Sequence, residues 1–398
     1  MQKKLNFGSL CVHDFTKNLK NKPHQLPIYA TSSFSFTGLQ QGIDVFSGKK
    51  EGHLYSRYGN PTIETVADKI ANLETFGLEL EAKCLLFSSG MAAISGLLMA
   101  MLKTGDQVLT QNNLYGGTTY FFNEILSPLG VQPIFADFSN LENVEVLLKK
   151  HPKVKMIYLE SPANPTLACI DLEKIVTIAK KYKVKTAIDN TFLTPYLQQP
   201  FQFGIDFIVH STTKYLNGHG NSVSGAVVGT DIDFMLQRVW KMMKLVGTNS
   251  NAFDAWLLNN GLKTLELRMK RHCENANAVA EYLSQHPQVK QVNHPSLQSH
   301  PDYELAKKQM RAAGGMLSFE LMGGFEAGLQ FMDHLKFCTI APTLGDVDTL
   351  IVHPASMSHL NIPKAAREAV GITDGLIRIS VGIENVEDII DDLAQAIR

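Results

Sequence analysis

The chain has 398 residues, and its 37 Lys and Arg residues nearly balance its 38 Asp and Glu residues, for a formal net charge of −1. Hydrophobic residues make up 44% of the sequence, enough for a large core, which excludes a disordered chain and predicts two or three domains. The charge balance and the absence of long Lys/Arg runs exclude a protein that binds nucleic acid through a basic surface.

Targeting and metal signals are absent from the sequence. No segment approaches the roughly 20 apolar residues of a membrane helix, and the first residues lack the apolar stretch of a secretory signal. We therefore expect a cytoplasmic protein without a membrane segment. The five cysteines are scattered without a Cys-x-x-Cys pair, and the histidines form no H-E-x-x-H pattern. We expect buried, reduced thiols and no metal site.

Residues 1–60 mix Pro, Gly, Ser and aromatic residues without a helical period. This pattern predicts an irregular arm. Such an arm buries little surface by itself, so we expect it to lie across another domain or a neighbouring subunit.

Residues 61–255 alternate short apolar runs with longer segments of helical period, which is typical of an α/β domain with a mostly parallel sheet and helices on both faces. The predicted strands are 84–88, 107–110, 131–135, 155–160, 186–189, 207–211 and 226–229. Ligands of open α/β sheets bind beyond the carboxyl ends of the strands, so the residues just after these runs are candidates for chemistry.

Residues 256–398 predict a smaller α+β domain. Apolar residues at three- and four-residue spacing within 253–286 indicate one long helix that ends near Pro287 and links the two domains. Strands are predicted at 316–321, 337–341 and 377–381, followed by a closing helix at 386–397.

Two polar residues stand at the expected ligand edge of the large sheet. Lys214 lies in residues 209–220 (VHSTTKYLNGHG), where a strand runs into hydroxyl groups and a glycine-rich turn, and Asp189 ends the preceding strand. Taken singly, Lys214 is also compatible with a solvated loop lysine, and Asp189 with an aspartate that caps the next turn. A buried strand-end carboxylate nevertheless needs a cation or donor, and a protonated pyridine nitrogen supplies one.

A third feature is residues 87–93 (FSSGMAA), where a strand, a tight turn and the start of a helix follow one another. Free N–H groups and the positive helix end at such a turn attract a phosphate, although an ordinary βα turn has the same pattern. Both G-x-G-x-x-G and G-x-x-x-x-G-K-[ST] are missing, which disfavours dinucleotides and nucleoside triphosphates. A lysine, a strand-end aspartate, a phosphate turn and nearby hydroxyls are together the parts that hold pyridoxal phosphate.

At this point the chain resembles the Cys/Met metabolism (trans-sulfuration) family of pyridoxal-phosphate enzymes, over nearly its whole length. The motifs that carry the resemblance are 55–62 (YSRYGNPT), 89–93 (SGMAA), 115–118 (YGGT), 160–165 (ESPANP), 189–191 (DNT), 211–215 (STTKY), 353–356 (HPAS) and 377–382 (IRISVG). The resemblance implies an aspartate-aminotransferase-like (fold type I) α/β fold, an amino-acid substrate, and a homotetramer built from dimers that share active sites.

The resemblance also implies roles for the matching residues. Lys214 would be the Schiff-base lysine and general base, Asp189 the partner of the pyridine nitrogen, and Tyr115 the stacking ring and proton donor. The phosphate would be held by Gly90, Met91, Ser211 and Thr213 of one subunit and by Tyr55 and Arg57 of its neighbour. The substrate would be bound by Asn164, Thr343 and Arg378. The planar fork of Arg378 suits a carboxylate, the alternative being a surface ion pair.

The reaction itself stays open within the family. Methionine γ-lyases have a cysteine where this chain has Gly117, yet residues 353–359 (HPASMSH) resemble those enzymes. Pro342 stands where cystathionine γ-lyases have a glutamate for a distal amino group, and Lys244 lies near a position that is acidic in methionine γ-lyases.

We predict γ-elimination, that is C–S lyase activity, on cystathionine or a related homocysteine-derived amino acid. The alternatives are γ-replacement on an O-acylhomoserine, methionine γ-lyase activity and β-elimination. Outside this reaction class, a pyridoxal-phosphate-binding protein without turnover is disfavoured by the complete set of site residues. A dehydrogenase is disfavoured because its glycine fingerprint is missing.

Overall fold

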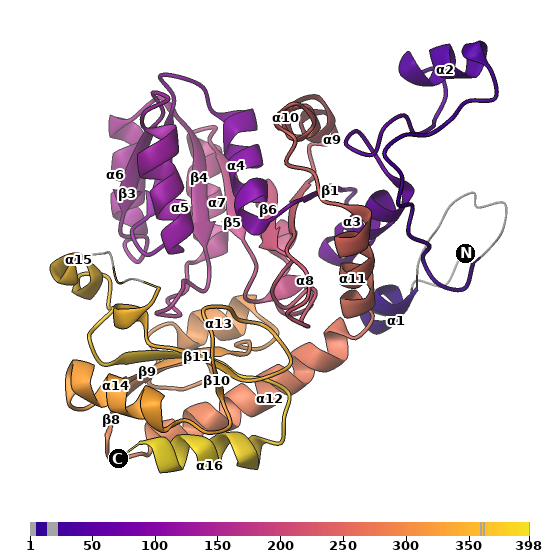
Figure 1. Cartoon of the computed structure of the whole chain (residues 1–398). Coiled ribbons are helices and arrows are strands. Elements are labelled where there is room, and N and C mark those ends of the chain that lie inside the picture. The colour runs from indigo at the N-terminus through magenta and orange to yellow at the C-terminus, as the bar shows by residue number, and fades with distance from the viewer. Residues whose placement is uncertain (1–4, 14–22, 359, 361–362, 398) are drawn as a thin grey trace.

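The computed structural model describes residues 5–13, 23–358, 360 and 363–397, which form two sheets connected by a long helix (Figure 1). Part of the predicted arm, residues 1–4 and 14–22, lies outside the described residues, as does His359 of the 353–359 motif. Among the helices that the structure describes, none is both long and apolar enough to cross a bilayer.

The large sheet has seven strands in the order β1-β7-β6-β5-β4-β2-β3. All neighbours are parallel except β7, which runs antiparallel to β1 and β6. The strands are β1 (Lys83–Phe87), β2 (Gln107–Gln111), β3 (Gln132–Ala136), β4 (Val154–Glu160), β5 (Lys185–Asp189), β6 (Phe207–Ser211) and β7 (Gly225–Gly229). Each lies within a residue or two of its predicted range, because short apolar runs between turn residues are a clear signal for buried strands.

Helices cover both faces of this sheet. Along β4, Ile157 and Leu159 face one hydrophobic core while Met156 and Tyr158 face the other, as the two-residue period of a strand requires. The first face is covered by α1 (Phe7–Val12), α3 (Pro61–Glu74), α6 (Leu141–Lys150), α7 (Leu172–Lys181), α8 (Thr194–Leu197), α11 (Ala252–Leu262) and the first half of α12 (Leu265–Ser284). The second face is covered by α4 (Gly90–Met101), η1 (Phe121–Leu126), η3 (Met235–Val239) and α10 (Trp240–Val246).

The second sheet is mostly antiparallel, with the order β10-β11-β12-β9-β8. Its strands are β8 (Val289–Asn293), β9 (Met316–Leu321), β10 (Thr339–Ile340), β11 (Leu350–Val352) and β12 (Leu376–Ser380). Its helices are α14 (Gly324–His334) and α16 (Val386–Ala396), which pack with the second half of α12 around one hydrophobic core. In Figure 1, α12 runs from α11 at the edge of the large sheet to this second core.

Three expectations for the C-terminal part need correction. The predicted strand 337–341 shrinks to β10, because the backbone N–H groups of Lys336, Phe337 and Cys338 donate to the Asp392 carboxylate instead of to a neighbouring strand. The single helix predicted within 253–286 is two helices, α11 and α12, which break at residues 263–264. Strands β8 and β11 were not predicted at all.

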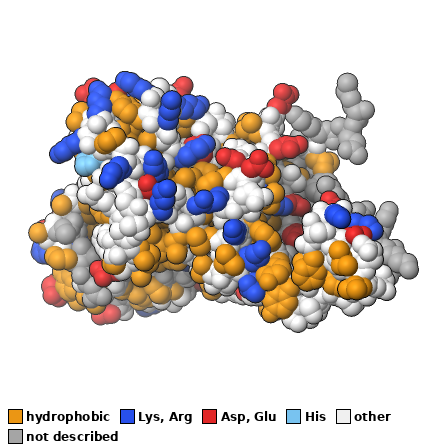
Figure 2. Space-filling view, turned by 90° about the horizontal axis from the view of Figure 1, so that it is seen from above, with side chains coloured by type: hydrophobic (Ala, Val, Ile, Leu, Met, Phe, Trp, Pro, Cys, Tyr) orange, Lys and Arg blue, Asp and Glu red, His pale blue; other side chains and the backbone are white. Residues whose placement is uncertain are grey.

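The arm is also more regular than predicted, since it contains α1 and α2 (Leu39–Phe46). Helix α2 projects away from both sheets in Figure 1, and its apolar side chains Leu39, Ile43 and Phe46 are 82%, 47% and 70% exposed. Figure 2 shows uncovered hydrophobic side chains at the same right-hand end of the molecule.

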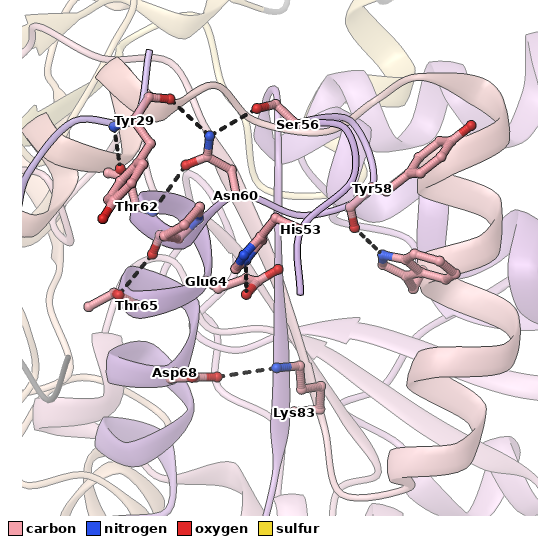
Figure 3. Close-up of polar contacts among 12 residues, drawn as sticks. Tyr29, His53, Ser56, Tyr58, Asn60, Thr62, Glu64, Thr65, Asp68 and Lys83 are labelled. Atoms are coloured by element: carbon pink, nitrogen blue, oxygen red, sulfur yellow. Dashed lines mark hydrogen bonds and ion pairs between the residues drawn. The ribbon is translucent and has the colours of Figure 1, made fainter. Parts of the chain in front are cut away.

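The end of the arm is tied firmly to α3 (Figure 3). Asn60 caps the helix by accepting a hydrogen bond from the Thr62 N–H, and its amide donates to the Tyr29 carbonyl over 2.9 Å. The Thr62 hydroxyl accepts from the Tyr29 N–H, and His53 contacts Glu64 at 2.9 Å. These contacts fix the main chain at Asn60, and therefore restrict where the preceding residues Tyr55 and Arg57 can lie.

All five cysteines are free and buried, as the sequence predicts. Burial raises the pKa of the Cys11 thiol to about 12 and that of Cys273 to about 11. It raises the pKa of the other three further still.

Candidate active site

A cavity of about 450 Å³ opens at the carboxyl ends of the central strands of the large sheet. All predicted site residues except Tyr55 and Arg57 line it, including Thr343 and Arg378 from the second half of the chain. The fold therefore brings residues 90 to 378 of the sequence together around one space. Among the described residues, no cluster of three or more His, Cys, Asp or Glu side chains could hold a metal ion.

One wall of the cavity is the turn between β1 and α4. The Ser89 hydroxyl caps α4 by accepting from the Ala92 N–H over 3.0 Å, so the remaining N–H groups of the first turn face the cavity end of the helix. Gly90 touches Ser211 so closely that a Cβ at position 90 would lie 2.7 Å from the Ser211 Cβ. Only glycine leaves room here, and a space bounded by helix N–H groups and a serine hydroxyl suits a phosphate.

The other predicted phosphate hydroxyl, that of Thr213, already has partners. It donates to the Ser224 carbonyl over 3.2 Å and accepts from the Ser224 N–H over 3.1 Å. To donate to a phosphate, Thr213 must therefore give up its bond to the Ser224 carbonyl.

Two carboxylates end adjacent strands beside this wall. Asp189 on β5 and Glu160 on β4 are register partners, and both line the cavity. Burial raises the pKa of each carboxyl, and the Asp189 charge raises that of Glu160 further. Asp189 accepts a hydrogen bond from the Thr191 N–H over 2.9 Å, which partly offsets the effect of burial.

Glu160 belongs to the 160–165 motif, but its own role is not predictable from the sequence. Both of its carboxylate oxygens accept from the Tyr115 N–H at 3.0 Å, so Glu160 fixes the backbone of the residue whose ring borders the cavity. A carboxylate at the end of an apolar strand was the signal that pointed to Asp189, and it applies equally to Glu160. The Tyr115 side chain is 48% exposed, and a Cβ at Gly117 would lie 2.6 Å from its ring.

Lys214 lies opposite, in the turn after β6. Its Nζ donates to the Thr343 hydroxyl over 2.7 Å. Burial lowers the pKa of Lys214 below its ordinary value, and the nearby Arg378 charge lowers it further. A lysine with a lowered pKa is uncharged more often at neutral pH, which a nucleophile or a base requires.

Arg378 on β12 points into the cavity and is only 5% exposed. It donates to the Thr343 carbonyl over 2.9 Å and, at 3.4 Å, to the Asn164 side-chain oxygen. Its Nε is buried without a partner among the described residues, and burial lowers its pKa to about 10. A surface ion pair is thus excluded, and a buried guanidinium bound only to neutral oxygens is suited to receive a carboxylate.

Thr343 therefore joins the two cationic groups, because it accepts from Lys214 through its hydroxyl and from Arg378 through its carbonyl. Asn164 and Pro342 line the same part of the cavity. One residue therefore contacts both the amine of Lys214 and the guanidinium of Arg378.

Tyr55 and Arg57 lie outside this cavity. Arg57 Nη1 donates to the Lys244 carbonyl over 2.5 Å, and its guanidinium lies over the Tyr58 ring, 5.0 Å from the centroid. Lys244 in turn lies over the Trp240 ring at 4.2 Å. The structure thus gathers Arg57 and Lys244 in an aromatic cluster at the base of the arm, separate from Lys214 of the same chain.

A family model for the Cys/Met metabolism PLP-dependent enzymes matches residues 9–398. The chain belongs to this family. The fold, the enzyme class and the pyridoxal-phosphate cofactor that the sequence predicts are thereby confirmed: it is a PLP-dependent enzyme of sulfur amino-acid metabolism that acts on carbon–sulfur bonds.

Individual members of the family are similar over nearly their whole length. The L-methionine γ-lyase of Fusobacterium nucleatum subsp. nucleatum is 47% identical over 99% of this chain and 98% of its own. The cystathionine β-lyase of Lactococcus lactis subsp. cremoris is 41% identical over 94% and 93%.

Solved structures agree with this assignment. Cystathionine γ-synthase of Xanthomonas oryzae pv. oryzae matches with a TM-score of 0.92 and 38% identity, over 99% of this chain and 98% of that one. A putative O-acetylhomoserine (thiol)-lyase of Campylobacter jejuni subsp. jejuni, which contains a pyridoxyl-lysine-phosphate, matches with 0.93 and 33% identity over 99% and 100%. The roles assigned to the individual site residues of this family member remain predictions.

Proposed function

We propose that this family member is a γ-lyase that converts L-methionine and water to 2-oxobutanoate, methanethiol and ammonia. The observation that carries the amino-acid lyase reaction is the Lys214–Thr343–Arg378 arrangement. Thr343 contacts both the amine of Lys214, whose pKa is lowered, and the guanidinium of Arg378, which can receive a carboxylate. Four L-methionine γ-lyases are 43–47% identical to this chain.

The lining of the cavity supports a short apolar thioether as the substrate side chain. Among the described residues that line the cavity, only Glu160, Asp189, Lys214 and Arg378 are charged. Its apolar members are Met91, Ile94, Pro162, Phe192, Val223, Pro342 and Leu344. Methionine needs no further charged partner, whereas the distal amino and carboxyl groups of cystathionine do.

The site residues fit pyridoxal phosphate. The glycine-lined turn at Gly90 and the hydroxyl of Ser211 would hold the phosphate, Asp189 would hold the pyridine nitrogen, and Lys214 would bind the aldehyde carbon. A cationic pyridinium next to Asp189 would favour the ionised carboxylate that burial disfavours. When bound, the cofactor supplies an electron sink for a carbanion at the substrate.

The protein groups carry out the binding and the proton transfers. Arg378 would bind the substrate carboxylate, with Asn164 beside it, and Lys214 would act on the Cα–H bond. Lys214, uncharged once it is free, accepts the Cα proton and can deliver it further along the side chain. The phenol of Tyr115, whose backbone Glu160 fixes, would protonate the departing thiolate.

A second candidate substrate is L-cystathionine, the substrate first predicted from the sequence. The observation that favours it is the cationic pair Arg57 and Lys244, which would meet a distal carboxylate if the arm reaches the active site of a neighbour. γ-Replacement on an O-acylhomoserine is the third candidate.

The test is to identify the keto acid after the purified, cofactor-loaded enzyme is incubated with each candidate without added thiol. We expect 2-oxobutanoate and methanethiol from L-methionine. Pyruvate from cystathionine, with no keto acid from methionine, would instead indicate a β-lyase and refute the proposal. Lys214→Ala should abolish turnover, whereas Lys185→Ala, which removes a surface lysine paired with Asp206, should not.

We also propose a cytoplasmic homotetramer built from two dimers that share active sites, in which residues 1–60 form an arm to the neighbour, 61–255 the cofactor domain and 256–398 the C-terminal domain. The uncovered apolar side chains of α2 and the position of Arg57 outside its own cavity support the arm contact. Five free cysteines are in line with a reducing compartment.

Co-expression of Arg57→Ala with Lys214→Ala tests the shared site, and sedimentation gives the oligomeric state. If Arg57 acts on the neighbour, a hybrid dimer has one intact site, and activity returns. If the hybrids stay inactive while both variants assemble normally, Arg57 does not act in trans.

A further inference from the structure

Helix α12 carries a buried polar stripe on the face toward the active-site loops. Arg268, His272 and Asn275 follow one another at four and three residues, so their side chains share one side of the helix. They are 4%, 0% and 1% exposed. Burying three polar side chains in a helix is costly unless each has specific partners.

The partners of Arg268 are main-chain carbonyls of the loop that holds Lys214. Its guanidinium donates to Tyr215 over 2.7 Å and to Leu216 over 3.3 Å, the two residues directly after Lys214. The same group donates to the Gly261 carbonyl over 2.8 Å, at the end of α11. Gly218 has a positive φ of 69°, and a Cβ there would lie 2.0 Å from Arg268 Nη1, so the loop is closed tightly around the guanidinium.

The partners of His272 and Asn275 are main-chain carbonyls just after β12, the strand that carries Arg378. His272 Nδ1 is 2.7 Å from the Val381 carbonyl, and Asn275 donates to the carbonyls of Gly382 and Glu384 over 3.0 and 2.8 Å. Burial lowers the pKa of His272 to about 4, so the ring is neutral at neutral pH and its one proton is used at Nδ1. The His272 ring also packs edge-on against Tyr215, with centroids 5.1 Å apart.

One helix face thus binds the main chain beside Lys214 at one end and the main chain beside Arg378 at the other. None of the three side chains lines the cavity. An α-helix is a stiff spacer of 1.5 Å per residue, so the separation of its two attachment points is fixed by its geometry.

We propose that Arg268, His272 and Asn275 are positioning residues that set the register between the Lys214 amine and the Arg378 carboxylate receptor. Arg268 orients the loop of Lys214, and His272 with Asn275 orients the strand of Arg378. The inference rests on the proposed function, because the substrate Cα must lie between the two groups for proton transfer.

Arg268→Met and Asn275→Ala should have different effects on the cofactor-loaded enzyme. Arg268→Met should lower kcat, by up to about 100-fold for a reacting group misplaced by about 1 Å, and leave KM nearly unchanged. It should also shift the pH of the absorbance transition of the bound cofactor, which reports on the bond to Lys214. Asn275→Ala should mainly raise KM for the amino acid and leave the spectral transition in place.

Two further variants separate positioning from stability. Arg268→Lys keeps a buried cation but loses the fork that reaches both carbonyls, so it should show the spectral shift even if Arg268→Met does not fold. Met269→Ala opens a cavity beside the stripe without touching either loop, since Met269 is fully buried in the first core. It should lower the melting temperature while kcat, KM and the spectrum of the folded enzyme stay unchanged.

The proposal is wrong if the stripe variants change kcat, KM and spectrum only in proportion to their loss of melting temperature, as Met269→Ala would. It is also wrong if Arg268→Lys leaves both kcat and the spectral transition at wild-type values. The spectral transition does not depend on the sulfur substrate, so this test stands even if L-methionine is not turned over by the wild type.

Discussion

The tight packing of Gly90 against Ser211 at the predicted phosphate site allows a sharp test with Gly90→Ala. A Cβ at this position would lie 2.7 Å from Ser211 Cβ, 2.9 Å from its Oγ and 3.0 Å from its Cα. Rotation of the Ser211 hydroxyl relieves only one of these contacts, because Cβ and Cα are fixed by the backbone of β6. The start of α4 and the end of β6 must therefore move apart by about 1 Å to restore a normal carbon–carbon distance of about 3.5–4.0 Å.

Overpacking of this kind typically costs about 1–3 kcal/mol. If the cost appears in cofactor binding, the Kd of pyridoxal phosphate should rise about 5- to 150-fold, since about 1.4 kcal/mol corresponds to tenfold. Titration of the apoenzyme with pyridoxal phosphate, followed by absorbance, measures this change. The difference in melting temperature between the Gly90→Ala and wild-type apoenzymes shows how much of the overpacking cost is present without the cofactor.

Gly116→Ala is the matched control, because a Cβ there has no neighbour closer than 4.0 Å although Gly116 also begins a helix near the cavity. Its cofactor affinity should stay at the wild-type value. Unchanged affinity and stability in Gly90→Ala would refute the argument that this turn needs glycine to form the phosphate site.

Three further outcomes follow from contacts in and behind the site. Thr343→Val removes the acceptor of Lys214 but keeps the carbonyl that binds Arg378, so steady-state kinetics should show kcat reduced about 10- to 100-fold, the value of a hydrogen bond to a charged group, with KM retained. Gly117→Ala places a Cβ 2.6 Å from the Tyr115 ring, which is half exposed and can move, so kcat should fall while the melting temperature stays constant; an unchanged kcat would mean that the ring position is not critical. His272 has a folded-state pKa of about 4, below its ordinary value of about 6.5, so the folded protein binds fewer protons and is destabilised as the pH falls through this window. Denaturant unfolding at pH 7 and pH 5 should show a loss that His272→Gln reduces by about 2 kcal/mol, and an equal loss in both proteins would contradict the assigned pKa.

Strand-end chemistry was the part of the site that the sequence could predict. Lys214, Asp189 and Gly90 each stand at or after the end of a short apolar run. Because parallel strands end at the same edge of a sheet, this pattern predicts that the three residues lie close together, and all three line the cavity. Glu160 ends β4 and satisfies the same criterion, but its partner, the Tyr115 N–H, lies 45 residues away in sequence and has no local signature.

Other features depend on partners that have no local signature. The apolar spacing in 253–286 identifies the buried face of α12 but says nothing of Arg268, whose buried guanidinium binds carbonyls about fifty residues away in sequence. Asp392 shortens the predicted strand 337–341 for the same reason, since a side chain from the last helix accepts the N–H groups of residues 336–338 in place of a neighbouring strand. The sequence gives no sign that the Thr213 hydroxyl is hydrogen-bonded to the Ser224 main chain.

The burial of all five cysteines bears on the durability of a C–S lyase, an enzyme whose own product is a thiol. Thiol–disulfide exchange and oxidation by peroxides both require an accessible thiolate. Here the most acidic cysteine, Cys273, has a pKa of about 11, and every sulfur is enclosed in the protein. The enzyme can therefore release a thiol without forming mixed disulfides with its own buried cysteines.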